Sequence, residues 1–193
     1  KIGAVAIPAT TQLMKKDYVY RFNAAGVSAV IATRDDGVPG HINDALPESP
    51  TVKLRIAAGG ESETPEGWLD FDAEVASLKY SAEFPRTPDT ACGDDMMLMY
   101  FTSGTTGYPK IAVHSHLYPL GHYVTARYWH NVNPNGVHLT IADTGWGKAA
   151  WGKIYGQWLC ETCVFVYDFD RFHADDILSV IEKYRITTFC APP

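Results

Sequence analysis

The sequence predicts an α/β fold with mostly parallel sheets flanked by helices. Short apolar runs, several of them rich in β-branched residues, alternate along the chain with segments of helical periodicity. The apolar runs are continuous, which is typical of parallel strands that helices cover on both faces. With 193 residues, of which 46% are hydrophobic, the chain is long enough to bury a sizeable core.

The first half of the chain predicts a βαβαβ unit. Its clearest helix extends over 13–25, where apolar residues recur at helical spacing and Gly26 is placed to end the helix. The apolar stripe consists of Met14, Tyr18, Phe22 and Ala25. The other predicted elements are strands over 2–7, 27–33 and 52–58, a short helix over 41–46, and helical turns marked by Phe71, Val75 and Leu78.

The second half repeats the alternation of strands and helices. Its best-marked helix covers 175–184, because two aspartates lie at the positive end of the helix dipole. Ile177, Ile181 and Tyr184 are expected to face inward from it. The remaining predictions are helices over 117–129 and 149–159 and strands over 96–101, 111–114, 138–142, 164–167 and 187–190.

These elements group into two α/β subdomains. The first covers residues 1–79 and the second covers residues 96–193. Residues 80–95, which include Pro85 and Pro88, are expected to be a linker because proline interrupts regular structure.

The strongest functional signal is a loop rich in hydroxyl groups and glycine between the apolar runs 96–101 and 111–114. Glycines let backbone N–H groups turn toward one concave side, hydroxyls add donors, and a lysine supplies a positive charge. The candidate phosphate-binding residues are Thr102, Ser103, Gly104, Thr105, Thr106, Gly107 and Lys110. The loop therefore predicts chemistry on a nucleoside triphosphate, with a turn that binds no ligand as the alternative.

A P-loop NTPase is a second alternative, but the residues around the lysine disfavour it. In that class the lysine opens a helix. Here Pro109 lacks a backbone N–H, and the run 111–114 after Lys110 is apolar and partly β-branched, which predicts a strand. The loop is therefore expected to join two strands.

The string from Tyr100 to Lys110 resembles the signature loop of the adenylate-forming (ANL) superfamily, which includes acyl-CoA synthetases, luciferases and peptide-synthetase adenylation domains. Residues 1–32 and 143–156 are most similar to acetyl- and medium-chain acyl-CoA synthetases, so the resemblance covers nearly the whole chain. It implies the large N-terminal domain of such an enzyme. It also implies the cosubstrates ATP and coenzyme A, magnesium, and a small carboxylic acid.

The resemblance implies a role for each part of the loop. The loop holds the β- and γ-phosphates of ATP while a carboxylate attacks the α-phosphorus, and the acyl-adenylate then passes to coenzyme A. Lys110 is expected to neutralise charge on the departing pyrophosphate. The hydroxyls and glycine backbone of the loop are expected to cradle phosphate oxygens, and magnesium would share the charge.

The chain is expected to be a fragment, because it begins at Lys1 without a methionine and stops at Pro193 directly after a buried-type strand. The family's adenine and ribose motifs, magnesium-binding glutamate, hinge and C-terminal catalytic lysine are not in this sequence. We therefore expect no activity from these residues alone. A non-catalytic nucleotide-binding or scaffold fragment is the alternative function.

Trp146 is the candidate residue for substrate binding. It follows an apolar strand, and ligands of α/β proteins collect beyond the carboxyl ends of parallel strands. The resemblance implies that this tryptophan borders the acyl chain and limits its length. A tryptophan packed in the core is the alternative. Trp151 and Trp158 lie seven residues apart on a predicted helix, which favours a core stripe over a site.

The cysteines and histidines give only weak signals of a metal site. Cys160 and Cys163 form a single C-x-x-C pair without a second pair, which favours a buried structural thiol where a helix turns into a strand. His114 and His116 would share one face of a continuing strand, but no third candidate metal ligand lies at a spacing typical of metal sites. No metal ligands are predicted.

Charge and hydropathy exclude several classes of partner. A net charge of −6 argues against nucleic acids and anionic membranes, which favour basic patches. The sequence contains neither an apolar run of about 18 residues nor a secretory signal, so a cytoplasmic protein is expected. The oligomeric state and the identity of the acid are not predicted.

Overall fold

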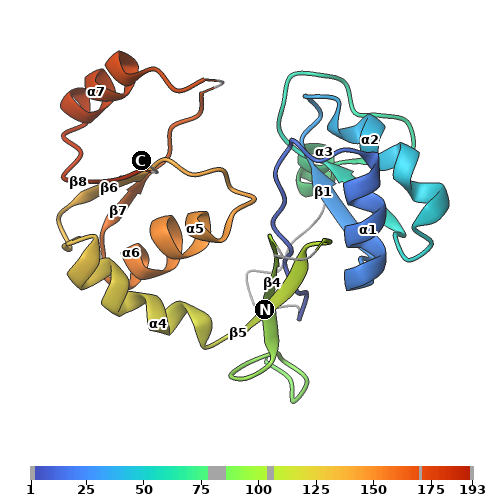
Figure 1. The fold of residues 1–193 in the computed structure, drawn as a ribbon, viewed down its shortest axis with the longest axis horizontal. Helices are drawn as coiled ribbons and strands as arrows, with labels where there is room; N and C mark the ends of the chain where they lie inside the picture. Colours follow the sequence, from blue (N-terminus) through green and yellow to red (C-terminus); the bar gives the residue numbers. More distant parts are fainter. Residues whose placement is uncertain (1–2, 78–85, 104–106, 170, 192–193) are drawn as a thin grey trace. The chain divides into compact units, whose positions relative to one another are not determined.

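The computed structural model describes residues 3–77, 86–103, 107–169 and 171–191 (Figure 1). The chain divides into two compact units, Ala9–Asp89 on the one hand and Lys1–Pro8 with Thr90–Pro193 on the other. The α/β prediction is confirmed, since parallel sheets and helices make up both units. The subdomain boundaries at residues 79 and 96 stay a prediction, and Leu78 and residues 80–85 lie outside the described ranges.

Unit Ala9–Asp89 contains a parallel three-stranded sheet in the order β1-β2-β3. Ala29 pairs with Leu54 and Ile56 pairs with Leu69, so the strands follow one another across the sheet as in a βαβ unit. The strands are β1 (Ala29–Ala32), β2 (Leu54–Ala57) and β3 (Leu69–Asp70), and the helices are α1 (Lys15–Ala25), α2 (Val38–Ala45), η1 (Leu46–Glu48) and α3 (Phe71–Ser77).

Helix α1 buries the middle of its predicted stripe. Tyr18 and Phe22 are each 5% exposed, and their ring centroids lie 5.5 Å apart. Gly26 ends the helix as predicted, with a φ of 59° that glycine adopts without strain. Met14 precedes the helix and is 51% exposed, so its predicted place in the stripe is wrong. Its position outside the helix explains this, because the spacing rule applies only to helical residues.

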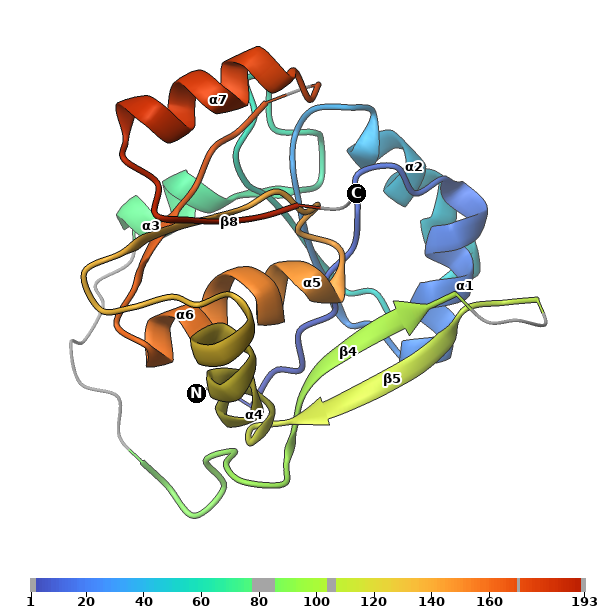
Figure 2. The same cartoon turned by 60° about the vertical axis from the view of Figure 1, so that its left-hand side comes forward.

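Unit Lys1–Pro8 with Thr90–Pro193 contains an antiparallel hairpin and a parallel sheet. The hairpin strands β4 (Met96–Thr102) and β5 (Lys110–Ser115) lie side by side (Figure 2). The strand predicted over 2–7 is wrong, because in the described part of this segment only Ala6 pairs, through a single parallel bridge to Leu98. Gly3, with a φ of 74°, and Pro8 leave the segment little room for an extended strand.

The parallel sheet of this unit has the order β7-β6-β8. Its helical layer includes two π-helical segments, η2 and η3, where the sequence predicts uninterrupted α-helices. The strands are β6 (Val137–Thr140), β7 (Cys163–Phe165) and β8 (Thr188–Cys190). The helices are α4 (Tyr118–Val124), η2 (Thr125–Trp129), α5 (Gly147–Ala149), η3 (Ala150–Ile154), α6 (Tyr155–Leu159) and α7 (Ala174–Lys183).

Two aromatic side chains predicted to be buried are exposed in this unit. Trp158 is 63% exposed, so the core stripe predicted for Trp151 and Trp158 is wrong. Trp151 lies within the π turn η3, which rotates the chain less per residue than an α-helix, so Trp151 and Trp158 no longer share a face. Tyr184 is 45% exposed because it lies just beyond the end of α7, where Ile177 and Val180 supply the buried face.

No helix within the described ranges combines the length and the apolar character that crossing a membrane would require.

The contact between α4 and α6 leaves no space for a side chain at Gly156. A Cβ atom there would clash with the backbone oxygen of His122 and would lie 2.7 Å from the Cβ of Ala126. We expect Gly156→Ala to lower the free energy of unfolding by at least about 1 to 3 kcal/mol, because neither neighbour can move without shifting backbone. Chemical denaturation of the variant measures this loss.

Gly121→Ala is the matched control, because Gly121 lies in α4 with no heavy atom within 4 Å of an added Cβ. This change is expected to be neutral or to stabilise by up to about 1 kcal/mol, since alanine favours helix. Equal stability of the two variants would contradict the tight packing at Gly156.

Candidate active site

The hairpin β4–β5 holds both ends of the candidate phosphate loop. Thr102 pairs with Lys110 in the antiparallel register, and the Thr102 hydroxyl donates to the Lys110 carbonyl at 3.2 Å. The prediction that the loop joins two strands is confirmed. The P-loop NTPase alternative is wrong, because a strand rather than a helix begins at Lys110.

The described parts of the loop are open to solvent. Ser103, Gly107 and Lys110 are exposed, and Gly107 has a φ of 110°, a conformation that favours glycine. Lys110 forms no salt bridge with any residue in the described ranges, so its charge is available to an anion. Gly104, Thr105 and Thr106 lie outside the described residues. The phosphate-binding roles of the loop residues stay predictions.

A stack of aromatic and imidazole rings lies behind the hairpin. The His114 ring is 5.7 Å from that of Tyr100 and 4.1 Å from that of Tyr118, and Tyr118 in turn lies 4.4 Å from His122. Burial raises the pKa of Tyr100 above its ordinary value, and the neighbouring Tyr118 and Tyr155 raise it further. The hydroxyl therefore stays protonated near neutral pH. The stack joins side chains of β4, β5 and α4, and the sequence analysis did not predict it.

Tyr100 also brings the hairpin next to the segment that carries Trp146. A Cβ atom placed on Gly147 would lie 3.8 Å from the Tyr100 ring, so Gly147 packs directly against that ring. Tyr100 is only two residues before Thr102, and Gly147 directly follows Trp146. The structure thus joins the two predicted parts of the site through one aromatic contact.

Trp146 lies on a short, ordered loop that leaves strand β6. The Asp143 carboxylate accepts from the Gly145 backbone N–H at 2.7 Å, and the Asp143 carbonyl accepts from that of Trp146 at 3.1 Å. The Trp146 side chain is 67% exposed, so the alternative that it packs in the core is wrong for this chain. Its role beside the acyl chain stays a prediction.

A buried polar network connects strand β6 to the helical segments η3 and α6 that follow the same loop. His138 is fully buried on β6, where its Nδ1 lies 2.7 Å from the Thr188 hydroxyl and its Nε2 lies 3.1 Å from the Gly152 carbonyl. The Gln157 amide donates to that carbonyl at 3.1 Å and to Nδ1 of His130 at 2.9 Å. The sequence predicts an apolar strand over 138–142 and gives no sign of this network.

Burial lowers the pKa of His138 to about 4, although the hydrogen bond to the Gly152 carbonyl opposes the shift. An unfolded histidine titrates near pH 6.5, so between about pH 6.5 and 4 the unfolded chain binds more protons than the folded one. The free energy of unfolding is therefore expected to fall by about 3 kcal/mol as pH drops through this window, and the loss from His138 levels off about one pH unit below it.

Denaturant unfolding of wild type and His138→Gln across this pH range measures the effect. The variant is expected to show a smaller slope than the wild type between pH 6.5 and 5, and the remaining slope includes that of His122 and His130, whose pKa values burial also lowers. His173→Gln, which changes an exposed histidine just before α7, is the control and should keep that slope. An unchanged slope in His138→Gln would contradict the assignment.

Of the histidines and cysteines that the sequence singled out, His114 and Cys160 pack against neighbouring side chains. His114 lies within the ring stack, and His116 lies in a turn after β5 ends, so the shared strand face is wrong. Cys160 is buried as predicted, whereas Cys163 is exposed on the sheet edge β7. No group of three or more His, Cys, Asp or Glu side chains suited to a metal occurs among the described residues.

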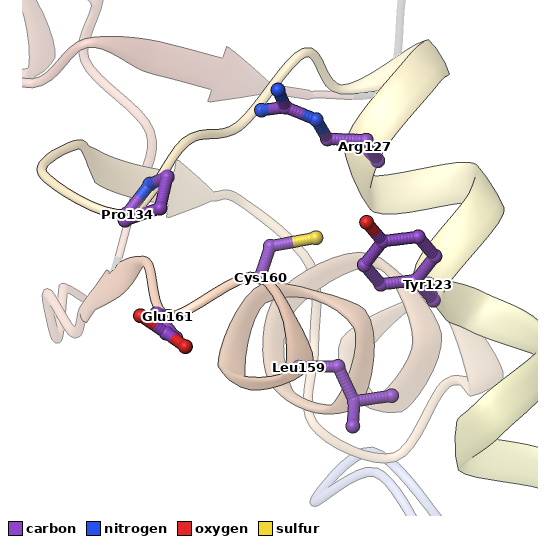
Figure 3. A pocket seen from close by; sticks show the side chains of 6 residues that line it. All are labelled: Tyr123, Arg127, Pro134, Leu159, Cys160 and Glu161. Atoms are coloured by element: carbon purple, nitrogen blue, oxygen red, sulfur yellow. The ribbon is translucent and has the colours of Figure 1, made fainter.

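A small surface pocket of about 250 Å³ lies between the α4–η2 helix and the end of α6 (Figure 3). Its only cation is Arg127, whose guanidinium donates to the Val132 carbonyl at 3.0 Å. Burial raises the pKa of the Cys160 thiol, which favours the unreactive protonated form. The pocket is lined by Tyr123, Arg127, Pro134, Leu159, Cys160 and Glu161, and it contains none of the predicted site residues.

The family model of AMP-binding enzymes matches residues 1–193 of the chain. Among curated proteins, the chain is 34% identical to the human protein named "Acyl-coenzyme A synthetase ACSM4, mitochondrial" and 33% identical to "Acyl-coenzyme A synthetase ACSM3, mitochondrial" from Pongo abelii. Each match covers 100% of the chain and 32% of the relative, so the chain spans about a third of their length. These names do not support the predicted cytoplasmic location.

Two solved structures share the fold. The acyl-CoA synthetase of Brucella canis superposes with a TM-score of 0.79 at 26% identity, and the match covers 100% of this chain and 33% of that one. The anthranilate CoA ligase AuaEII, solved in complex with anthranoyl-AMP, gives a TM-score of 0.82 at 21% identity over 98% of this chain and 35% of that one. At that identity the second likeness bears on the fold alone.

Proposed function

The chain belongs to the family of AMP-binding enzymes, and from this membership we propose that it is part of an AMP-forming acyl-CoA synthetase. The proposed substrate is a carboxylic acid between acetate and medium chain length. The observation that carries the proposal is the hairpin register between Thr102 and Lys110, which presents a lysine and a hydroxyl-rich loop together. The relatives named acyl-coenzyme A synthetases support it.

The proposed reaction has two steps. The substrate carboxylate attacks the α-phosphorus of ATP, which forms acyl-AMP as the bond to pyrophosphate breaks. The thiol of coenzyme A then attacks the acyl carbonyl, loses its proton, and releases AMP as the thioester forms. In the first step negative charge grows on the departing pyrophosphate, so a fixed cation beside it stabilises the transition state.

The residues of this chain fit the first step. Lys110 is proposed to pair with the departing pyrophosphate, because its side chain is exposed and has no salt bridge within the described ranges. Ser103 and the loop from Gly104 to Gly107 are proposed to donate to phosphate oxygens, and Thr102 would join them by turning its hydroxyl from the Lys110 carbonyl to the phosphate. Magnesium prefers phosphate oxygens and water, and bound there it would neutralise part of the phosphate charge.

Incubation of the full-length protein with ATP, magnesium, coenzyme A and a series of acids from acetate to octanoate tests the proposal. AMP and an acyl thioester are expected in equal amounts, and both should require the acid. Tight ATP binding without acid-dependent AMP would instead favour the nucleotide-binding or scaffold alternative.

Trp146 gives a prediction about acid length. In the full-length protein, Trp146→Ala is expected to raise kcat/KM for longer or branched acids relative to short ones, because the smaller side chain leaves room beyond the carboxylate. The expected change in preference is about 10- to 200-fold, the range that one methylene of pocket space can produce. A series of acids of increasing length measures it.

Trp158→Ala is the matched control, since Trp158 is exposed to a similar degree and lies at the far end of the same helical segment. It should leave the length preference unchanged. An equal loss of kcat/KM for every acid in Trp146→Ala would remove Trp146 from the acyl site.

A further inference from the structure

Hydrogen bonds to one backbone carbonyl close the loop that carries Trp146. Thr140 is the last residue of β6, and its hydroxyl donates to the carbonyl of Gly152 in η3. His138, two residues earlier on the same strand, places Nε2 3.1 Å from that oxygen. The two ends of segment 141–151, which has Trp146 at its centre, are therefore held next to each other.

The closure is buried and held from two sides. His138 and Gln157 are 0% exposed and Thr140 is 2% exposed. Thr140 and His138 reach the carbonyl from the sheet, whereas Gln157 reaches it from α6 at 3.1 Å. Buried hydrogen bonds are strong because water does not compete for them, so three side chains together fix the position of the π turn. Single π turns inside helices occur often at functional sites.

The loop is ordered between its fixed ends. The backbone N–H groups of Gly145 and Trp146 donate to Asp143, and that of Ala149 donates to the Trp146 carbonyl at 2.9 Å. Gly147 lies against the Tyr100 ring of the hairpin. A shift of Gly152 relative to β6 would therefore move Trp146 as part of one connected segment.

We propose that Thr140, His138 and Gln157 are positioning residues that hold the Trp146 segment and thereby set acid specificity without touching the acid. The part concerning specificity rests on the proposed function. The part concerning position does not, because it concerns the hydrogen bonds of the loop itself.

Thr140→Val in the full-length protein tests both parts, since valine keeps the shape and removes the hydroxyl. Thr162→Val is the matched control, because Thr162 is 3% exposed in the same unit and its hydroxyl also donates to a backbone carbonyl, that of Asn133 at 2.7 Å. Hydrogen exchange followed by mass spectrometry reports on the amides of 141–151. A series of acids reports on specificity.

Thr140→Val removes the hydrogen bond from the Thr140 hydroxyl to the Gly152 carbonyl and also the contact of that hydroxyl with Nε2 of His138 at 2.8 Å. We expect exchange within 141–151 to become at least about 5- to 10-fold faster, the change that the loss of the first hydrogen bond alone predicts. The ratio of kcat/KM between long and short acids should change with it. Thr162→Val should leave both unchanged, and Thr140→Ser, which restores the hydroxyl, should approach the wild type. If Thr140→Val does not fold, Gln157→Met is expected to give the same two changes.

If the amides of 141–151 exchanged at the wild-type rate in both Thr140→Val and Gln157→Met, the positioning role would be overturned. Faster exchange with an unchanged acid preference would overturn the link to specificity. A wild-type protein that forms no acyl-AMP would refute the proposed function, and the exchange result would still decide whether these residues hold the loop.

Discussion

Lys110→Ala is expected to slow acyl-adenylate formation in the full-length protein by about 10- to 1000-fold, the range for removal of one electrostatic contact to a transition state. Lys110 is the first residue of β5 and pairs with Thr102, so it lies at the point where the phosphate loop ends. Removing it leaves the growing charge on pyrophosphate without this partner. The rate of pyrophosphate release in the first turnover with saturating ATP and acid measures the loss.

Lys110→Arg should recover only part of this rate, because a planar guanidinium does not occupy the place of a compact ammonium. Lys16→Ala is the control, since Lys16 is an exposed lysine on α1 of the other unit and should not affect the rate. If Lys110→Ala turned over as fast as Lys16→Ala, Lys110 would have no part in the mechanism.

Residues 1–193 alone are expected to form no acyl-CoA, even though they contain the entire loop. Adenylation requires nucleotide, metal and carboxylate to be positioned together, and a misplacement of about 1 Å can cost about 100-fold in rate. The chain spans about a third of the relatives it matches, and the motifs expected to grip adenine are not in its sequence. ATP binding by these residues should therefore be weak.

The assay combines the purified 193-residue chain with ATP, magnesium, coenzyme A and acids from acetate to octanoate. The same chain with Lys110→Ala provides the background. AMP release that depends on acid and exceeds this background would show that these residues are a self-sufficient catalyst, and would refute the proposal that they are inactive alone.

The sequence predicted the elements whose formation depends on residues within the element or next to it. The helix at Tyr18 and Phe22 follows from apolar spacing and from Gly26 at its end. The strand after Lys110 follows from Pro109 and from a short β-branched run. Both signals lie within a few residues of the element they predict, and both were confirmed.

Features that depend on distant contacts were not predicted. The π turn η3 coincides with side chains from β6 and α6 that bond to Gly152, and no periodicity within 149–159 reveals them. His138 belongs to a strand that reads as apolar, and its polar partner Thr188 lies 50 residues away in sequence. Tyr100 contacts His114 and Gly147, which only the folded chain brings together. The sequence was enough to propose the phosphate loop. It did not reveal the contacts of Tyr100 and the hydrogen bonds of His138 that surround the site.

Isotope exchange between pyrophosphate and ATP shows whether the protein forms acyl-AMP. In the full-length protein, labelled pyrophosphate should enter ATP only when a carboxylic acid is present, and coenzyme A should not be needed, because acyl-AMP and pyrophosphate form before the thiol reacts. Exchange is expected to require the acid and to fall about 10- to 1000-fold in Lys110→Ala. Thioester formation that releases ADP and phosphate, with no exchange of pyrophosphate under any condition, would contradict it.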